Sequence, residues 1–369
     1  MRHDDPLLSR GNIFRACVYA VVFLVLLEIS ISVSFLKQGT YRLLKSYEFL
    51  KKWDISRFTL ILESRNECDW MVNATIKNLQ RILDSKCQPV RVCSISPPDL
   101  VGQLETYKSA PPYKEMIKLY PLVKPGGRYT PYECISRESV AIIIPFRDRE
   151  EHLRILLHNL HPILQRQQLD YGIYVIEQTN GTQFNRAMLM NIGYAESIKL
   201  YNYTCFIFHD VDLIPENDRI MYDCIGSPRH LSCAVDKFKY RLPYVTLFGG
   251  VTAIKREHFE KVNGHSNKFF GWGGEDDDMF RRLVHHGFNI SRYPMAMSRY
   301  KMIKHRKNAG NRANKKRHNL VSTGKRRYKY DGINKLLYSR LAIEFRQLHT
   351  RIIVSINETQ VMRIHEKSN

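Results

Sequence analysis

The sequence has no pair of cysteines in a CxxC spacing and no cysteine–histidine combination at the spacing of a zinc site. Its eight cysteines are therefore not expected to bind a metal. Cys17 lies in an apolar segment, which leaves seven cysteines in the rest of the chain. Disulfide bonds in an oxidising compartment are the better interpretation. Because seven is an odd number, at least one thiol stays free or pairs with another chain.

Acidic residues are absent from residues 299–330, although the same stretch contains thirteen lysines and arginines. The whole chain of 369 residues has a net charge of +21, so this segment concentrates much of the excess. A basic block of this kind suits nucleic acid, a membrane face, or phosphate and diphosphate groups. The length allows one large domain or two ordinary ones.

Polar residues are scarce in residues 16–36, where Glu28 is the only charged side chain. About twenty apolar residues span a bilayer. A cleaved signal peptide is the alternative, although its apolar core is usually shorter and is followed by a small-x-small site. We expect a cytoplasmic tail at 1–15, a transmembrane signal anchor at 16–36, a stem at 37–90 and a lumenal domain at 91–369.

Five Asn-x-Ser/Thr sequences also place the bulk of the chain in a secretory lumen. Some of them occur by chance, and Asn180 stands beside a candidate site. We predict glycosylation at Asn73, Asn202, Asn289 and Asn357. A lumenal chain with a membrane segment is not expected to bind nucleic acid.

Apolar runs alternate with helical periodicity in the middle of the chain, after an irregular lead-in at 95–135 that is rich in Pro, Gly and Tyr. Strands are predicted at 139–146, 171–177 and 204–209, and helices at 151–165 and 185–197. This order predicts an α/β fold with a mostly parallel sheet. In such sheets the ligand lies beyond the carboxyl ends of the strands.

Two carboxylates, Asp210 and Asp212, follow the third predicted strand. Residues two apart in an extended chain point the same way. The pair is therefore a candidate for holding a divalent cation that neutralises a diphosphate, with a turn before Pro215 as the alternative. Met302 and His305 are a second candidate pair of ligands, for an ion such as Mn²⁺. A core methionine beside a surface histidine is the alternative there.

Cationic and aromatic residues follow the first two predicted strands. Arg147 and Arg149 come after the first strand, where two guanidinium groups suit a phosphate or a base edge. A solvated helix start is the alternative. Phe184 and Arg186 follow the second strand, where the ring can stack on a nucleobase and the guanidinium can clamp it. Otherwise Phe184 is a hydrophobic staple before the helix.

Three glycines and a tryptophan precede four consecutive carboxylates in residues 269–280, FFGWGGEDDDMF. The glycines make the backbone permissive around Trp272, as a mobile active-site loop requires. Tryptophan offers a flat face for a sugar ring, and one carboxylate can remove a proton from an attacking hydroxyl. One or two of the acids could instead serve the start of a helix predicted at 276–286, where negative charge is favourable.

Together these stretches resemble the β-1,4-galactosyltransferase family. The matching sequences, in order, are IIIPFRDRE, FNRAMLMNIG, FHDVDLIPEND, LPYVTLFGGVTAI, VNGHSNKFFGWGGEDDDMFRRL and MIKH. They run from about Cys134 to Tyr338. The resemblance implies a type II Golgi membrane protein with a GT-A catalytic domain, a single mostly parallel mixed sheet flanked by helices. It also implies inverting, Mn²⁺-dependent transfer of a sugar from a UDP donor to terminal N-acetylglucosamine.

The resemblance further implies roles for individual residues. The Mn²⁺ ligands would be Asp212, Met302 and His305. The donor site would comprise Pro145, Phe146, Arg147, Arg149, Phe184, Arg186, Asp210, Val211, Lys237, Leu247, Gly250 and Trp272. The acceptor site would comprise Gly274, Glu275, Asp276, Asp277, Arg317 and Val321. Catalysis would rest on Asp276, the base for the acceptor 4-hydroxyl, with Glu275 and Trp272.

The two disulfide bonds of the family map to Cys93–Cys134 and Cys205–Cys224, which leaves Cys68, Cys87 and Cys233 unassigned. The basic block after His305 matches a long flexible loop that closes over the bound donor. Membrane attachment through one N-terminal helix is implied as well. The oligomeric state stays open, with a homodimer as one option.

Two positions depart from the family pattern. Leu247 stands before FGG, where the galactosyltransferases have Tyr, and a leucine leaves room for an N-acetyl group at the donor's 2-position. Invertebrate members with Leu or Ile there resemble β-1,4-N-acetylgalactosaminyltransferases. In the acceptor's N-acetyl pocket, His318 replaces the usual Phe and Val321 the usual Ile, which bears on acceptor choice.

We therefore predict transfer of GalNAc from UDP-GalNAc to terminal N-acetylglucosamine on glycoproteins or glycolipids. Transfer of galactose from UDP-galactose to the same acceptor is the alternative. A non-catalytic sugar-binding member is a third interpretation, but the implied metal ligands and the base are all present in the sequence.

Overall fold

The computed structural model describes residues 91–304 and 311–366. The chain divides between Val90 and Arg91 into two units. The predicted anchor, the stem and Asn73 belong to the first unit and lie outside the described residues. In the part that is described, no helix is both long and apolar enough to cross a membrane.

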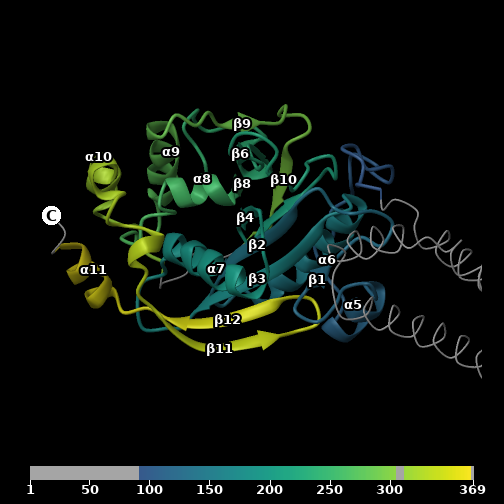
Figure 1. Ribbon diagram of the computed structural model, residues 1–369, viewed down its shortest axis with the longest axis horizontal. Helices are drawn as coiled ribbons and strands as arrows, with labels where there is room; N and C mark the ends of the chain where they lie inside the picture. Colours follow the sequence, from purple (N-terminus) through teal and green to yellow (C-terminus); the bar gives the residue numbers. More distant parts are fainter. Residues whose placement is uncertain (1–90, 305–310, 367–369) are drawn as a thin grey trace, which may run out of the picture. The chain divides into compact units, whose positions relative to one another are not determined.

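A nine-stranded mixed sheet forms the centre of the second unit, in the order β11-β12-β3-β2-β4-β8-β6-β9, with β1 paired to β3. Figure 1 shows β11 and β12 at one edge of this sheet and β6 and β9 at the other. The strands are β1 (Arg128–Tyr129), β2 (Ser139–Phe146), β3 (Asp170–Gln178), β4 (Cys205–His209), β6 (Arg229–His230), β8 (Val251–Lys255), β9 (Ser291–Arg292), β11 (Ser339–Phe345) and β12 (Thr350–Ser355).

The middle of the sheet is parallel: β12 pairs with β3, β3 with β2, and β2 with β4. β2 has the sequence SVAIIIPF, and all its residues except the first are buried. Such a continuous apolar run is typical of a parallel strand that is covered on both faces. The three predicted strands and the α/β fold class are confirmed, with strand ends shifted by at most one residue.

Helices cover both faces of the central strands. On one face, Ile142 and Ile144 of β2 pack into a core with Leu153 and Leu156 of α6. On the other face, β2 packs into a second core with residues of α7, among them Met188. The helices of the described part are α5 (Tyr113–Leu119), α6 (Glu150–Arg166), α7 (Arg186–Leu200), α8 (Arg256–Lys261), α9 (Glu275–His285), α10 (Arg317–Arg327) and α11 (Glu358–Glu366), with 3-10 turns η2 (Asp236–Phe238) and η3 (Ile333–Lys335).

The predicted helices are confirmed as α6, α7 and α9. Asn185, predicted as the first residue of its helix, is instead the N-cap of α7, where its side-chain oxygen accepts a hydrogen bond of 2.9 Å from the Met188 amide. The lead-in contains the short elements α5 and β1, which the sequence analysis did not predict.

A second sheet of three strands, also not predicted, lies beside the first. Its order is β5 (Leu213–Pro215), β10 (Arg299–Met302) and β7 (Ala234–Val235). Three residues of β10 pair with β5, and this register sets Met302 opposite Leu213. Two residues that are far apart in the sequence, Asp212 and Met302, are thereby brought close together.

Both predicted disulfide bonds are present, Cys93–Cys134 and Cys205–Cys224. Glu138 lies near the Cys205–Cys224 disulfide. The two sulfurs are bonded to each other, so these three residues do not form a metal site. Cys233 is free and buried, and its thiol donates to the Ser298 hydroxyl. Cys68 and Cys87 lie outside the described residues.

Four buried charged side chains tie α9 to α10. Arg282 pairs with Asp278 at 2.7 Å and with Asp331 at 3.5 Å. Arg327 pairs with Asp331 and, at 3.4 Å, with Asp278. None of these side chains is more than 8% exposed, so the charges neutralise one another away from water. We call Asp278, Arg282, Arg327 and Asp331 the buried ion network.

The network predicts a large difference between two neighbouring arginines. Arg327→Ala should lower the free energy of unfolding by about 3–5 kcal/mol, because it leaves two buried carboxylates with Arg282 as their one remaining guanidinium partner in the network. Arg326 is exposed, so Arg326→Ala should change it by less than about 0.5 kcal/mol. Urea unfolding of the full chain measures both variants, and equal losses would contradict the structural role of the network.

Candidate active site

The site lies at the edge of the sheet where parallel strands end. Phe146, the last residue of β2, pairs with Glu177 near the end of β3, and β4 ends at His209 in the adjacent position. Of the implied donor residues, Arg147 and Arg149 follow β2, Phe184 and Arg186 follow β3, and Asp210 follows β4. These residues thus lie at the carboxyl edge of the sheet, where α/β proteins bind ligands.

Arg186, the first residue of α7, connects the donor side of this edge to the acidic loop. Its Nε donates to Asp210 at 2.6 Å, and its Nη2 donates to the Gly250 carbonyl at 3.3 Å. Its Nη1 lies 3.7 Å from Glu275 Oε1. One guanidinium group therefore holds together three segments, at residues 210, 250 and 275.

The segment Asp210–Asp212 is a turn between β4 and β5 rather than an extended chain, as the alternative interpretation of the sequence had it. The Leu213 amide donates to the Asp210 carbonyl at 3.4 Å across this turn. Asp210 is engaged by Arg186, whereas Asp212 is 9% exposed and its carbonyl accepts from the Ile303 amide at 2.8 Å.

The residues present fit a divalent cation in part. Asp212 supplies a carboxylate, and the pairing of β5 with β10 brings Met302 to the same place. Burial raises the pKa of Asp210 to about 6, with the charge of Asp212 acting in the same direction. A cation would relieve this crowding of carboxylates. His305, the third implied ligand, lies outside the described residues.

The remaining donor residues surround this edge to different degrees. The Arg147 guanidinium lies 5.1 Å from the centre of the Phe184 ring, and its Nη1 donates to the Thr182 carbonyl. Pro145 and Phe146 belong to β2, Arg149 precedes α6, and Val211 packs against the core. Lys237 belongs to η2 and lies over the ring of Phe238.

Trp272 is 62% exposed, and its backbone is held on both sides. Its amide donates to the Arg312 carbonyl at 2.8 Å, and its carbonyl accepts from Asn314 at 2.9 Å. Gly271, at φ 85°, passes so close that a Cβ there would lie 2.4 Å from the Arg312 oxygen. The glycine positions the tryptophan by allowing this contact, in addition to permitting its unusual backbone angle.

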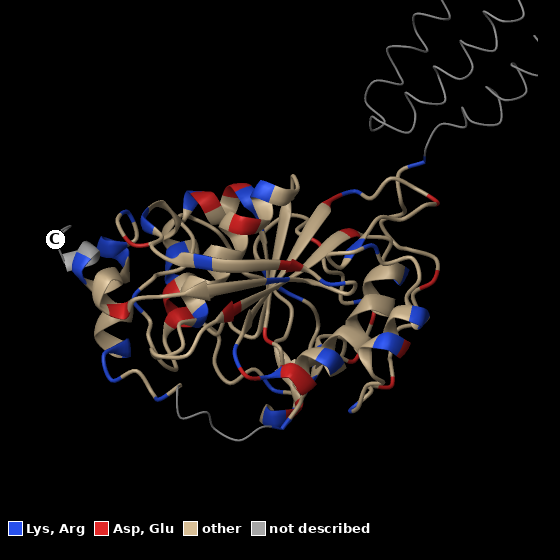
Figure 2. Ribbon diagram, turned by 90° about the horizontal axis from the view of Figure 1, so that it is seen from below, with Lys and Arg blue, Asp and Glu red and all other residues tan. Residues whose placement is uncertain are grey.

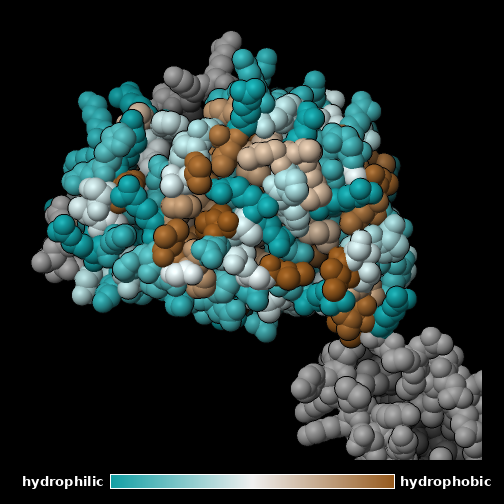
Figure 3. Space-filling model, turned by 90° about the horizontal axis from the view of Figure 1, so that it is seen from above, coloured by the Kyte–Doolittle hydropathy of each residue, from teal (hydrophilic) through white to brown (hydrophobic). Residues whose placement is uncertain are grey.

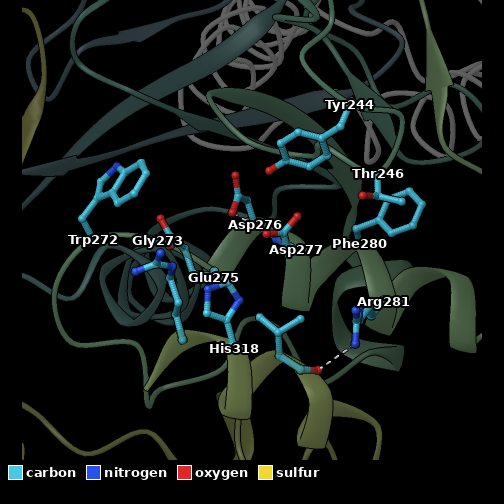
Figure 4. A pocket seen from close by; sticks show the side chains of 13 residues that line it. Tyr244, Thr246, Trp272, Gly273, Glu275, Asp276, Asp277, Phe280, Arg281 and His318 are labelled. Atoms are coloured by element: carbon cyan, nitrogen blue, oxygen red, sulfur yellow. Dashed lines mark hydrogen bonds between the residues drawn. The ribbon is translucent and has the colours of Figure 1, made fainter. Parts of the chain in front are cut away.

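A cavity of about 410 Å³ lies between the start of α9 and α10 (Figure 4). Trp272 stands at one end of it and Phe280 and Arg281 at the other, with Asp276 and Asp277 between them. The predicted acceptor residues all line it. The full lining is Tyr244, Thr246, Trp272, Gly273, Gly274, Glu275, Asp276, Asp277, Phe280, Arg281, Arg317, His318 and Val321.

The four consecutive acids divide into two roles. Glu275, Asp276 and Asp277 face the cavity, and Asp278 turns inward to the buried ion network. Gly249 makes room for Asp276, because a Cβ there would lie 2.6 Å from its Oδ2. Helix-start electrostatics, the alternative explanation for some of the acids, accounts for their position but not for their convergence on one cavity.

Burial and mutual repulsion perturb these acids. Burial, with Asp276 adding to the effect, raises the pKa of Glu275 to about 7. The Glu275 Oε2 atom has no hydrogen-bond partner among the described residues. Burial and Asp276 also raise the pKa of Asp277, and the same two causes raise that of the Tyr244 phenol beside it. The cavity therefore favours ligands that donate hydrogen bonds, as sugar hydroxyls do.

Several lining residues were missed or left without a role in the sequence analysis. Tyr244 and Thr246 belong to the quoted stretch LPYVTLFGG, and Phe280 and Arg281 follow the acids, so helical spacing could have indicated them. His318, noted as a departure, lines the cavity. Leu247 does not line it; this half-buried residue has its amide bonded to Tyr244 and its carbonyl to Arg292.

The predicted glycosylation sites Asn202, Asn289 and Asn357 are all exposed, as is Asn180. Their use remains a prediction. Asn180 and Asn357 border the same hollow, next to the carboxyl ends of β3 and β12.

Comparisons with known proteins agree with this site. A family model described as the N-terminal region of glycosyl transferase group 7 matches residues 93–225, and one described as the N-terminal domain of galactosyltransferase matches residues 229–306. The chain is 46% identical over 266 residues to β-1,4-galactosyltransferase 2 of Cricetulus griseus, and the match covers 72% of each protein.

The chain belongs to the β-1,4-galactosyltransferase family.

It is also 49% identical over 265 residues to β-1,4-galactosyltransferase 1 of Mus musculus, covering 72% of this chain and 66% of that protein. The match thus spans about two thirds of the length of the mouse relative. These relatives are named for galactose, the alternative donor of the sequence analysis, and their names do not support N-acetylgalactosamine.

Solved structures confirm the GT-A fold. The chain resembles the catalytic domain of Drosophila β-1,4-galactosyltransferase 7 in complex with xylobiose, with a TM-score of 0.51 and 26% identity, over 62% of this chain and 98% of that one. A mutant of the same Drosophila enzyme, solved with manganese, UDP-Gal and xylobiose, matches equally well. Those ligands belong to that protein.

The raised pKa of Glu275 predicts how stability depends on pH. Between pH 4.5 and about 7 the folded chain holds a proton that an ordinary glutamate has lost. Stability should therefore fall as pH rises across this window, by up to about 1.4 kcal/mol per pH unit from this group. Glu275→Gln should flatten the slope, measured by urea unfolding at several pH values.

The control for this measurement is Glu257→Gln, which changes a carboxylate whose side chain is 71% exposed. It should leave the slope as in the wild type. A Glu275→Gln variant that follows the wild-type slope would show that Glu275 ionises normally in the folded chain.

Proposed function

We propose that this chain transfers galactose from UDP-galactose to the 4-hydroxyl of a terminal N-acetylglucosamine, with inversion at the anomeric carbon. One observation carries the proposal: a cavity lined by Asp276 adjoins the donor edge, and Arg186 joins the two through Asp210 and Glu275. The relatives named above, galactosyltransferases by name, support the choice of sugar.

In the proposed reaction Asp276 accepts the proton of the acceptor hydroxyl. The hydroxyl oxygen forms a bond to the anomeric carbon of the donor sugar, and the bond from that carbon to the diphosphate oxygen breaks. UDP leaves with the electron pair. Glu275 and Asp277 accept hydrogen bonds from sugar hydroxyls, and the Trp272 ring covers the sugar at one end of the cavity.

We propose that Asp212 and Met302, with His305, hold a divalent cation, Mn²⁺ by preference. Such an ion supplies charge that neutralises the leaving diphosphate. A manganese complex of the Drosophila relative supports this proposal. A thioether and an imidazole suit Mn²⁺ better than Mg²⁺, because Mg²⁺ demands near-ideal octahedral coordination by oxygen.

A second candidate function is transfer of N-acetylgalactosamine, which Leu247 favours. Its position is fixed through Tyr244, whose carbonyl accepts the Leu247 amide at 3.2 Å. An aliphatic side chain there suits the methyl of an N-acetyl group better than a hydroxyl. One contact of this kind is worth about 1–3 kcal/mol, so it shifts a preference without excluding galactose.

The proposed setting is the Golgi lumen, with the domain held by a single N-terminal helix at 16–36. The two disulfide bonds and the exposed sequons support an oxidising lumen. A homodimer remains an open prediction.

Removal of the proposed base provides one test. Asp276→Asn should lower kcat for galactose transfer by about 10²–10⁴, because the amide cannot accept the hydroxyl proton. Asp99→Asn, at an exposed position, should keep wild-type activity. A chelator should abolish transfer in the wild type, and added Mn²⁺ should restore it. Full activity in the Asp276→Asn variant would rule out this residue as the base.

Donor choice gives a separate test. Leu247→Tyr should raise the ratio of kcat/KM for UDP-Gal over UDP-GalNAc by roughly 10–100-fold, because the tyrosine crowds the 2-position. Initial rates with each donor and one acceptor measure this ratio. An unchanged ratio would show that position 247 does not contact the donor's 2-substituent.

A further inference from the structure

The outer end of the acceptor cavity is basic. Arg281 of α9 and His318 of α10 line this cavity, and both are exposed. Arg281 Nη1 donates to the Val321 carbonyl at 3.2 Å, which places it over the middle of α10. Lys325 follows Val321 by four residues, one turn or about 6 Å further along the helix. We call Arg281, His318 and Lys325 the basic rim.

No acidic residue occurs in the sequence between Asp278 and Asp331. Both of these aspartates form ion pairs within the buried ion network. In the described part of the chain, no ion pair joins Lys325 to a carboxylate, and the first turn of α10 has no acid. Charges of both signs are interspersed elsewhere (Figure 2). Beyond Asp278, the surface of α9 and α10 thus carries positive charge, and Lys325 pairs with no carboxylate among the described residues.

Asp277 is a cavity carboxylate that interacts with two residues of the rim. The charges of Arg281 and His318 act to lower its pKa, although burial and Asp276 outweigh them. Arg281 stands at the end of the cavity opposite Trp272 (Figure 4), and Arg317 packs against Gly273 at the Trp272 end, so cations flank the acids. A ligand that fits the whole cavity donates hydrogen bonds to the acids and carries negative charge at the Arg281 end.

We propose that the basic rim binds an anionic group, a sulfate or carboxylate, on the acceptor oligosaccharide beyond the sugar that receives the transferred residue. The inference rests on the proposed function, because it assumes that the terminal acceptor sugar occupies the cavity. Continuity of the rim with this cavity favours the remainder of the same oligosaccharide as the occupant, since that part of the ligand must leave past Arg281 and His318.

An anionic membrane is the other source of negative charge. It is less consistent with the side chains that the protein exposes around α9 and α10. Exposed apolar side chains on α9 and just after α10 are few, with Val284 at 50% and Tyr330 at 46% exposure. On the face seen in Figure 3, hydrophobic groups are separated by hydrophilic ones rather than continuous. That face therefore has no broad apolar surface that could insert into lipid.

Direct binding is the first test, because it does not depend on catalysis. The probe is a sulfated oligosaccharide ending in N-acetylglucosamine, compared with its desulfated counterpart, and the protein is the full chain in detergent micelles. Wild type should bind the sulfated form more tightly, and added salt should weaken this preference. Lys325→Glu should raise the Kd for the sulfated form about five- to tenfold and leave the desulfated form unchanged.

Arg326→Glu is the matched control. It reverses the same charge at the next residue, which points about 100° around the helix from Lys325. It should lower binding of the sulfated form much less than Lys325→Glu does. If both variants lose the same affinity for the sulfated form, the attraction comes from the positive charge of the whole helix. That result would overturn the rim as a site.

Further outcomes separate the sources of failure. Equal affinity of the wild type for sulfated and desulfated forms overturns the inference. So does Lys325-dependent binding to vesicles with anionic lipid when the sulfated form has no advantage. In the transfer reaction, Lys325→Glu should raise KM for the sulfated acceptor and leave kcat unchanged. If the wild type transfers sugar to neither acceptor but still prefers to bind the sulfated form, the proposed function is refuted and the rim is not.

Discussion

The buried ion network determines the geometry on which the acceptor site depends. Asp278 and Arg282 belong to α9, Arg327 to α10, and Asp331 to the loop that follows, and their charges balance with almost no exposure to water. Gly324 allows this close approach, since a Cβ there would lie 2.2 Å from Asp278 Oδ1. A buried ion pair need not add stability relative to apolar packing, but sliding one helix past the other would leave these buried charges unpaired. The paired arrangement of α9 and α10 sets the three remaining acids opposite Arg317 and His318.

Arg186 has the corresponding role on the donor side. It carries one positive charge into a region where Asp210, Asp212, Glu275 and Asp276 come together, and it cannot neutralise all of them. Burial is the main cause of the raised pKa values of Asp210 and Glu275, and the neighbouring carboxylates add to it. The surplus of negative charge is the reason that a divalent cation would suit the site. In the proposed reaction the cation and the arginines would bind the diphosphate, and the acids would bind sugar hydroxyls.

Much of this fold was predictable from the sequence, because β2, β3 and β4 are unbroken apolar runs and α6 has clear helical spacing. The motif FFGWGGEDDDMF indicated the site, and the two disulfide pairs followed from the family resemblance. Other features depend on long-range pairing that local patterns do not contain. The sequence did not show the β5–β10 register beside Met302, the inward turn of Asp278, or Tyr244 beside Asp277. The turn at Asp210–Asp212 also differs from the extended chain that was predicted. N-acetylgalactosamine, inferred from Leu247 alone, is less well supported than galactose once the relatives are considered.

The central claim is that this site joins a donor sugar to a terminal N-acetylglucosamine. The most direct test incubates the full chain with Mn²⁺, UDP-galactose and a GlcNAc-terminated acceptor, and determines the linkage of the product by NMR. The account predicts a single β-1,4-linked galactose on the acceptor, with release of one UDP for each sugar transferred. Hydrolysis of UDP-galactose without a glycosylated product, or a product of another linkage, would contradict it.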